Sequence, residues 1–398
     1  MKSAPLVIAS ICSSPSWGGM EMQTVIGAEA LARRGHRVIL FTAKRTPIER
    51  EAKARGLETI PILPSGSRAY AARYLSPVLA RHLRRRKVRI AHTEFSRDLW
   101  LLVPAALLAN GVPVILTKRH ASNVNKKDPL HRFLHKHTAR VIAISSAVEE
   151  DFLKRTTLPP EKIVRIPNGI DLDRFRVDPG AREETRREMG APPDAPVAGL
   201  VGRISRGKGH PDFLRAAVRV AAEFPEARFW IVGSMTRGEE RYDAEARRLA
   251  AESGLGDRIL FTGFREDVPR VLAALDVLVV PSSSEALGNV VLEGMAAGLP
   301  VAATGAAGIL DLIEDGETGL LFPPGDPEAI AGAMIRLFRD REEARGMGRR
   351  ARERARNKFD REKRTDRIEA LYAEVLRERD AGRFRRSRAE SARRGGER

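Results

Sequence analysis

Several features are scarce in this chain, and each scarcity limits what the protein can be. Cys12 is the only cysteine in 398 residues, so no disulfide can form within the chain, which fits a reducing compartment. No apolar run approaches the roughly 20 residues of a membrane-spanning helix, so a soluble or peripheral protein is expected. Aromatic residues make up only 5% of the chain, so the cores must be built mainly from alanine, valine, leucine and isoleucine.

Acidic residues are also outnumbered, with 52 Asp and Glu against 70 Lys and Arg, for a net charge of +18. Such a balance favours anionic partners, which are nucleic acid, anionic lipid or phosphorylated substrates. A nucleic-acid-binding protein is the remote alternative. Aromatic residues are not interleaved with basic ones, and no helix-turn-helix, zinc or RNP pattern is present. We therefore expect no nucleic-acid partner.

The N-terminal segment MKSAPLVIASICSSPSWGG contains one lysine and a short apolar run that leads into two glycines. This pattern predicts a first strand followed by a helix, and not a cleaved signal peptide. Strand-like and helix-like segments then alternate along the chain, which predicts βαβ units around parallel sheets. After a polar stretch with Pro and Gly near residues 170–195, a second such series begins.

The fold predicted from this organisation is α/β, with two Rossmann-like domains facing each other across a cleft. Residues 1–175 would form the first domain, and residues 176–379 the second domain with closing helices. Residues 380–398 are basic and have no apolar period, which predicts a disordered tail.

The segment PSSSEALGNVVLEGMAAGLPV, residues 281–301, is apolar apart from Glu285 and Glu293. A strand precedes it, and the helix within it closes at Gly298. Glu285 therefore follows the carboxyl end of a strand, where ligands bind in open α/β sheets. Gly288 opens the helix, whose free N–H groups attract phosphate, and Glu293 about one turn inside suits a ribose diol. The alternative is a loop carboxylate and an ordinary charge at a helix start.

A second segment, VGRISRGKGH at residues 201–210, follows a strand and brings Arg203 and Lys208 to the same sheet edge. It resembles a P-loop, but Gly209 and His210 stand where the magnesium-binding Ser or Thr would be. Two cations without a metal ligand suit a leaving diphosphate instead. A third segment, WGGMEMQ at residues 17–23, forms a weaker phosphate cradle before a helix and is not a nicotinamide fingerprint.

These segments, together with IPNGIDLDRF at residues 166–175, resemble the retaining glycosyltransferases of family 4, which have the GT-B fold. The resemblance implies transfer of a sugar from a nucleotide-sugar donor with retention of configuration, with no metal and no other cofactor. Same-face attack assisted by the leaving phosphate is implied, so Glu285 would position the sugar without attacking it. A nucleotide-sugar 2-epimerase on the same fold is the alternative.

The resemblance also implies roles for individual residues. Arg203 and Lys208 would hold the diphosphate, and Glu285 would contact the sugar hydroxyls. In the family the residue before Gly288 is often aromatic, and here it is Leu287. The other implied donor contacts are the backbone of Gly288, Asn289 and Val290, Glu293 at the ribose, Gly19 and His120 from the first domain, and Phe264 and Arg265 near the base.

The segment SRAYAARYLSPVLARHLRRRKVRI, residues 67–90, predicts a basic amphipathic helix that Pro77 kinks or splits. Such a helix can lie on an anionic bilayer, or it can pack its apolar face on the first sheet. Membrane or acceptor contacts are expected from Arg84, Arg85, Arg86, Lys118 and Arg119. The predicted acceptor is a glycan or lipid-linked hydroxyl in bacterial envelope polysaccharide or lipopolysaccharide synthesis. The enzyme would be cytoplasmic, with a peripheral position on the inner membrane face.

Overall fold

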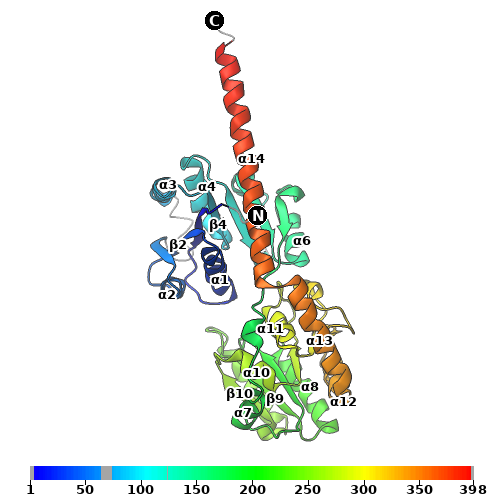
Figure 1. The fold of residues 1–398 in the computed structure, drawn as a ribbon. Coiled ribbons are helices and arrows are strands. Elements are labelled where there is room, and N and C mark those ends of the chain that lie inside the picture. Colours follow the sequence, from blue (N-terminus) through cyan, green and yellow to red (C-terminus); the bar gives the residue numbers. More distant parts are fainter. Residues whose placement is uncertain (1–3, 64–73, 123, 396–398) are drawn as a thin grey trace. The chain divides into compact units, whose positions relative to one another are not determined.

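The computed structural model describes residues 4–63, 74–122 and 124–395, and for residues 383–395 it describes the backbone. The chain divides into two compact units, and each is described by itself. One unit comprises Met1–Pro167 with Glu362–Arg398, and the other comprises Asn168–Arg361. Figure 1 shows that each contains a central sheet with helices around it.

The N-terminal unit is built on seven parallel strands in the order β3-β2-β1-β4-β5-β6-β7. The strands are β1 Val7–Cys12, β2 Arg37–Ala43, β3 Glu58–Leu63, β4 Ile90–Thr93, β5 Val114–Lys118, β6 Thr138–Ala143 and β7 Ile163–Arg165. The helices are α1 Gly19–Arg33, α2 Pro47–Ala54, α3 Ser76–Arg85, α4 Leu99–Leu108, α5 Pro129–Lys136 and α6 Ser146–Arg155, with short 3-10 helices at Ser96–Asp98 and Pro160–Lys162.

The C-terminal unit is built on six parallel strands in the order β10-β9-β8-β11-β12-β13. The strands are β8 Val197–Val201, β9 Arg228–Val232, β10 Ile259–Gly263, β11 Val277–Val280, β12 Val301–Thr304 and β13 Leu320–Phe322. The helices are α7 Ala181–Glu188, α8 His210–Glu223, α9 Glu240–Glu252, α10 Val268–Ala274, α11 Asn289–Ala297, α12 Pro327–Arg339 and α13 Arg341–Lys358, with 3-10 helices at Asp173–Phe175, Gly256–Arg258 and Ala307–Asp311.

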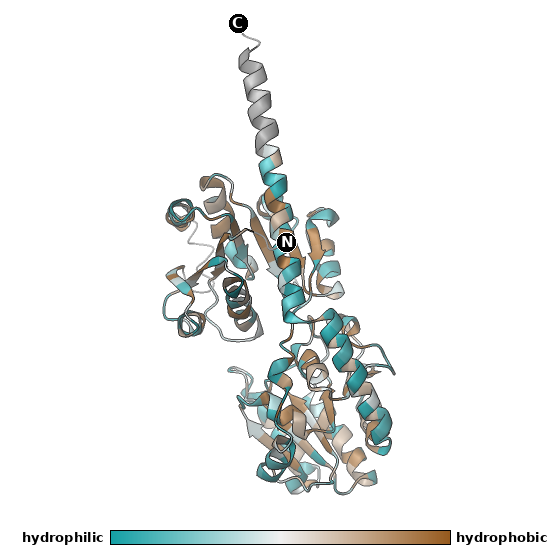
Figure 2. Cartoon of the chain, viewed as in Figure 1, coloured by the Kyte–Doolittle hydropathy of each residue, from teal (hydrophilic) through white to brown (hydrophobic). Residues whose placement is uncertain are grey.

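Both sheets have the strand order of a Rossmann-like fold, which confirms the predicted fold class. Central strands such as β5 and β11 are buried along their whole length, because helices cover both faces of a parallel sheet. Figure 2 accordingly shows the strands as mainly hydrophobic. Strand order reverses between β1 and β4 in one unit and between β8 and β11 in the other. Ligands bind at the carboxyl ends of strands beside such a switch point.

The last helix, α14 at Arg361–Gly395, packs with the N-terminal unit. Its residues Ile368, Tyr372 and Val375 belong to the core cluster under the N-terminal sheet. The Tyr372 hydroxyl lies 2.6 Å from His92 Nδ1, and Arg34 pairs with Glu362 at 2.6 Å. From the sequence, residues 362–379 were expected in the second domain. In the folded chain, the contacts of α14 place these residues in the N-terminal unit instead.

Disorder was expected for residues 380–398, but α14 continues as a helix to Gly395. The prediction is therefore wrong for the backbone of residues 380–395. Arginine and alanine dominate this segment, and both have a high helix propensity. The segment also extends a helix whose earlier turns are held by packing, so it needs no new nucleation.

Candidate active site

The loops after β8 and β11 lie together at the switch point of the C-terminal sheet. The Ser283 N–H donates to the Gly207 carbonyl at 2.9 Å, which joins the two loops. Gly209, with φ +74°, caps α8, and a Cβ there would lie 2.1 Å from the Pro281 carbonyl oxygen. Only glycine allows so close an approach in this backbone conformation. The glycines of the sequence motif therefore bring the two predicted donor-binding segments into contact.

This arrangement places Lys208 beside Glu285. The Lys208 ammonium forms an ion pair with Glu285 Oε1, and the Ser282 hydroxyl donates to the same oxygen at 2.9 Å. The Lys208 side chain is 32% exposed and that of Glu285 is 15% exposed. An incoming diphosphate must therefore compete with Glu285 for Lys208. Arg203 in the same loop is exposed and has no ion pair with another residue that the structure describes.

The start of α11 forms as predicted. Gly288 caps the helix with φ +94°, and Gly298 ends it with φ +73°. The Asn289 side chain accepts from Asn168 Nδ2 at 2.8 Å, so the NGID motif supports the first turn of α11. Leu287, where the family often has an aromatic residue, is 2% exposed and packs in the core.

Glu293 lies one turn inside α11 and is partly buried. Its carboxylate has no hydrogen bond or ion pair with another described residue. Burial raises the pKa of Glu293 to about 7, while the Arg174 guanidinium acts in the opposite direction. A carboxylate with unused acceptor capacity beside a helix N-terminus suits a pair of hydroxyl donors.

Phe264 and Arg265 follow β10, two strands from β8. Phe264 is 72% exposed. Arg265 pairs with Glu188, and its Nη2 lies 2.7 Å from Asp267 Oδ2. Hydrogen bonds to Asp267 and Glu188 raise the pKa of Arg265. Its charge is thus offset by two carboxylates, in contrast to that of Arg203.

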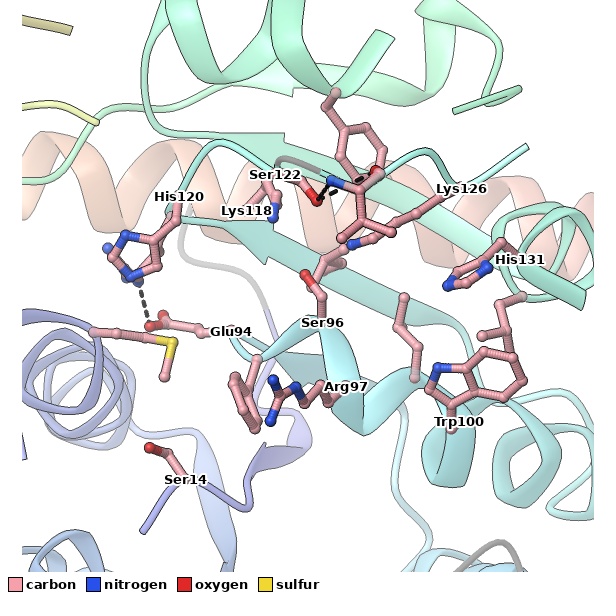
Figure 3. Close-up of a pocket in the computed structure, with 18 of the residues that line it drawn as sticks. Ser14, Glu94, Ser96, Arg97, Trp100, Lys118, His120, Ser122, Lys126 and His131 are labelled. Carbon is pink, nitrogen blue, oxygen red and sulfur yellow. Dashed lines mark hydrogen bonds and ion pairs between the residues drawn. The ribbon is translucent and has the colours of Figure 1, made fainter. Parts of the chain in front are cut away.

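The N-terminal unit has a cavity of about 660 Å³ at its own switch point. Ser14 after β1, Glu94 after β4 and Lys118 at the end of β5 contribute to its wall, as Figure 3 shows. His120 is exposed and lies on one side of this cavity. Gly19 begins α1 in the same unit. The predicted approach of Gly19 and His120 to the donor stays a prediction.

An ion pair braces the His120 side of the cavity. The Arg119 Nε donates to Glu94 Oε2 at 2.6 Å, and the Thr24 hydroxyl donates to the same oxygen at 2.9 Å. Burial alone would raise the pKa of Glu94, but Arg119 and Arg364 hold it below its ordinary value. Arg119 is only 4% exposed and Lys118 only 7%. The two residues therefore belong to the cavity wall and are not available to a membrane surface.

Helix α3 begins at Ser76 with Pro77 in its first turn, so this proline lies at a helix start. Leu79 and Leu83 are 1% and 0% exposed, because they pack in the core of the N-terminal unit. These two leucines are thus not available to a bilayer, whereas Tyr74 before the helix is 71% exposed. Of the predicted contacts, Arg84 and Arg85 are exposed and Arg86 is partly buried beside His82 and Glu58. The predicted positions 67–73 lie outside the described residues.

Sequence reasoning missed the cavity residues Glu94, Arg97 and Trp100. The signal was available for them, because HTEFSRDLW follows a strand that ends at the switch point. Sequence reasoning expected the basic segment KKDPLHRFLHKH, residues 126–137, beside the acceptor, and this segment contributes Lys126, His131 and His135 to the cavity. Across the described parts of the chain, no group of three or more His, Cys, Asp or Glu side chains lies together as a metal site. Within the same parts, no helix is both long enough and apolar enough to span a membrane.

Two Rossmann-like units, each with a polar site at its switch point, define the architecture of a GT-B glycosyltransferase. Comparison with known proteins supports this assignment. The family Glycosyl transferases group 1 matches residues 181–354, and Glycosyltransferase Family 4 matches residues 17–174. The chain is 34% identical over 365 residues to 2-deoxystreptamine N-acetyl-D-glucosaminyltransferase of Streptomyces fradiae, covering 82% of this chain and 84% of that one.

The lipopolysaccharide core biosynthesis glycosyltransferase LpsE of Rhizobium meliloti is 36% identical over 188 residues, or 47% of this chain and 53% of that one. Among solved structures, Anabaena HepE in complex with UDP and glucose has a TM-score of 0.80 at 22% identity, covering 92% of this chain and 99% of that one. The chain belongs to glycosyltransferase family 4 and is a glycosyltransferase.

Proposed function

We propose that this glycosyltransferase moves a sugar from a nucleotide diphosphate to an acceptor hydroxyl, with retention and without a metal ion. The observation that carries the proposal is the loop pair at the C-terminal switch point. It combines an unpaired Arg203, a Lys208–Glu285 ion pair, a glycine-capped helix start and a Glu293 carboxylate with unused acceptor capacity. UDP is the first nucleotide to test, because HepE was solved with UDP.

In this proposal the donor diphosphate displaces Glu285 from Lys208. The two cations, Arg203 and Lys208, then neutralise the charge that develops on the leaving phosphate, as fixed donors do in other enzymes. Glu285, released from its ion pair, accepts hydrogen bonds from hydroxyls of the transferred sugar. The acceptor hydroxyl gives its proton to the leaving phosphate on the same face of the sugar. No residue of the chain needs to form a covalent intermediate.

The acceptor side of the proposal is the cavity of the N-terminal unit, with His120 on its rim. The expected acceptor, a glycan or lipid-linked hydroxyl in bacterial envelope polysaccharide or lipopolysaccharide synthesis, is supported by the similarity to LpsE. The Streptomyces relative is named for 2-deoxystreptamine instead. Both acceptors offer a hydroxyl on a polar ring, which a polar cavity of this size accommodates.

A thermal-shift panel of UDP, GDP, ADP and their glucose conjugates tests the donor class. A ligand that binds only the folded state raises the melting temperature. Incubating the stabilising nucleotide sugar alone, and following isomerisation of its sugar, separates transferase from 2-epimerase. A panel in which no nucleotide shifts the melting temperature would count against the donor site. Sugar isomerisation without any acceptor would favour the epimerase.

A further inference from the structure

Three cationic side chains besides Arg119 line the N-terminal cavity, whose wall also contains Glu94. Lys118 ends β5, Lys126 lies in the loop before α5, and Arg97 lies in the 3-10 helix after β4. Figure 3 shows Lys118 and Arg97 in the middle of the cavity, with Lys126 reaching in from the side of His131. The Lys118 residue is 7% exposed, so its charge is directed into an enclosed space.

None of these three side chains has a hydrogen bond or ion pair with another residue that the structure describes. The negative charge of Asp151 raises the pKa of both lysines. Asp151 is already occupied, because Arg155 Nε donates to its Oδ1 at 2.6 Å and the Ser122 N–H donates to its Oδ2 at 2.7 Å. The charges of the three cations are thus largely uncompensated.

The cations also destabilise one another. Burial lowers the pKa of Lys118 to about 8, and the charge of Lys126 lowers it as well. Burial lowers the pKa of Lys126, and Arg97 adds to this effect. A like charge that lowers a neighbour's pKa lies close to that neighbour, and an anion between the cations would relieve the repulsion.

The same side of the cavity has further groups for a polar ligand. His135 is 3% exposed, and its Nδ1 has no hydrogen-bond partner among the residues that the structure describes. Burial lowers the pKa of His135 to about 4, so the ring is neutral near pH 7. The Trp100 and His131 rings pack edge to face with centroids 5.2 Å apart and form an aromatic wall.

We propose that this cavity binds a phosphate monoester on the acceptor, through Lys118, Lys126 and Arg97. The site rests on the proposed function only in that the acceptor is the molecule that carries the phosphate. A phosphate monoester has close to two negative charges and three strong acceptor oxygens, which match several converging cations. A carboxylate would compensate one charge and leave two cations unpaired. The acceptor hydroxyl then points from the phosphate toward His120, on the other side of the cavity.

The test uses the full chain with UDP at saturation, so that phosphate does not bind at the donor loops. Titration calorimetry at constant ionic strength measures the affinity of inorganic phosphate and glucose 6-phosphate, with glucose and glucuronate as uncharged and carboxylate controls. Dihexanoyl phosphatidic acid supplies a lipid source of the same group. The variants are Lys118→Met and Lys126→Met, which keep the aliphatic stem. Lys127→Met is the matched control, because Lys127 is exposed and does not line the cavity.

We expect each cavity variant to lower the affinity for inorganic phosphate at least about tenfold, since one charged hydrogen bond is lost. Lys127→Met should stay within about twofold of wild type. Binding of phosphatidic acid but not glucose 6-phosphate would support the site and assign a lipid source. Equal phosphate affinity in all four proteins, or a preference for glucuronate, would overturn the proposal. If wild type shows no melting shift with UDP, the donor assignment fails, whereas the variant series still decides the phosphate site.

Discussion

Replacing Glu293 with glutamine tests whether this residue binds the donor ribose as a carboxylate. Burial raises the pKa of Glu293 to about 7, so about a tenth of it is ionised at pH 6 and about nine tenths at pH 8. If only the ionised form accepts the two ribose hydroxyls, UDP affinity gains about tenfold over this range, or about 1.4 kcal/mol. At pH 8 the glutamine variant should bind UDP about tenfold or more weakly, since hydrogen bonds to a charged group are lost.

The assay is UDP titration calorimetry at pH 6, 7 and 8, with the result expressed as the ratio of wild-type to Glu293→Gln affinity. The ratio removes the titration of the nucleotide's own phosphate, which has a pKa near 6. At pH 7 wild type should also release about half a proton on binding, visible as a difference between buffers of different ionisation enthalpy. A ratio that is constant from pH 6 to pH 8 would refute the reasoning.

The same titration affects stability, and the sign is opposite to that of an ordinary carboxylate. Glu293 keeps its proton up to about pH 7 in the folded state. Between the ordinary pKa of a glutamate and pH 7, the folded chain therefore binds more protons than the unfolded chain. This contribution to the unfolding free energy is complete below about pH 4.5 and is lost as the pH rises to 7, by at most about 1.4 kcal/mol per unit. The difference between wild type and Glu293→Gln in urea unfolding should follow that window.

Three further outcomes are expected. Lys208→Ala should lower kcat on the order of 10²–10³-fold, because one transition-state contact is lost. EDTA should leave wild-type activity unchanged. A variant kcat within about threefold of wild type would show that Lys208 does not have this role. Glu285→Gln should abolish transfer and leave UDP affinity unchanged or higher, because Glu285 competes for Lys208; weaker UDP binding in calorimetry would contradict this. Wild type should sediment with anionic but not with neutral vesicles at low salt. Changing Arg84, Arg85 and Arg86 to Glu should reduce the fraction that sediments with anionic vesicles. Equal recovery with both vesicle types would exclude electrostatic docking.

Vesicle binding of this kind depends mainly on charge, since Leu79 and Leu83 of α3 are in the core and only Val78 is an exposed apolar residue of this helix. Leu79 and Leu83 are buried, whereas Arg84 and Arg85 are exposed. The expected binding is therefore weak and disappears at high salt, where the Debye length falls to a few ångströms.

The sequence by itself determined the fold class and the position of the two loops that we propose bind the donor. Alternating strand-like and helix-like segments specify parallel sheets, because burial on both faces demands continuous apolar strands. Each donor motif is local, with glycines and charged residues directly after one strand, so Lys208, Glu285 and the start of α11 could be placed from their own segments. The polarity of a parallel sheet then brings both loops to one edge.

Only the tertiary structure decided what depends on contacts between distant segments. An amphipathic pattern is the same whether a helix packs on a sheet or lies on a bilayer, so the burial of Leu79 could not be foreseen. The unit that α14 joins depends on which core accepts Tyr372, and not on a local pattern. Lys118, Lys126 and Arg97 come from three separate segments, which are the end of β5, the loop before α5 and the 3-10 helix after β4. Their convergence in one cavity, with no direct ion pair to a described carboxylate, follows from strand order and packing that no single segment encodes.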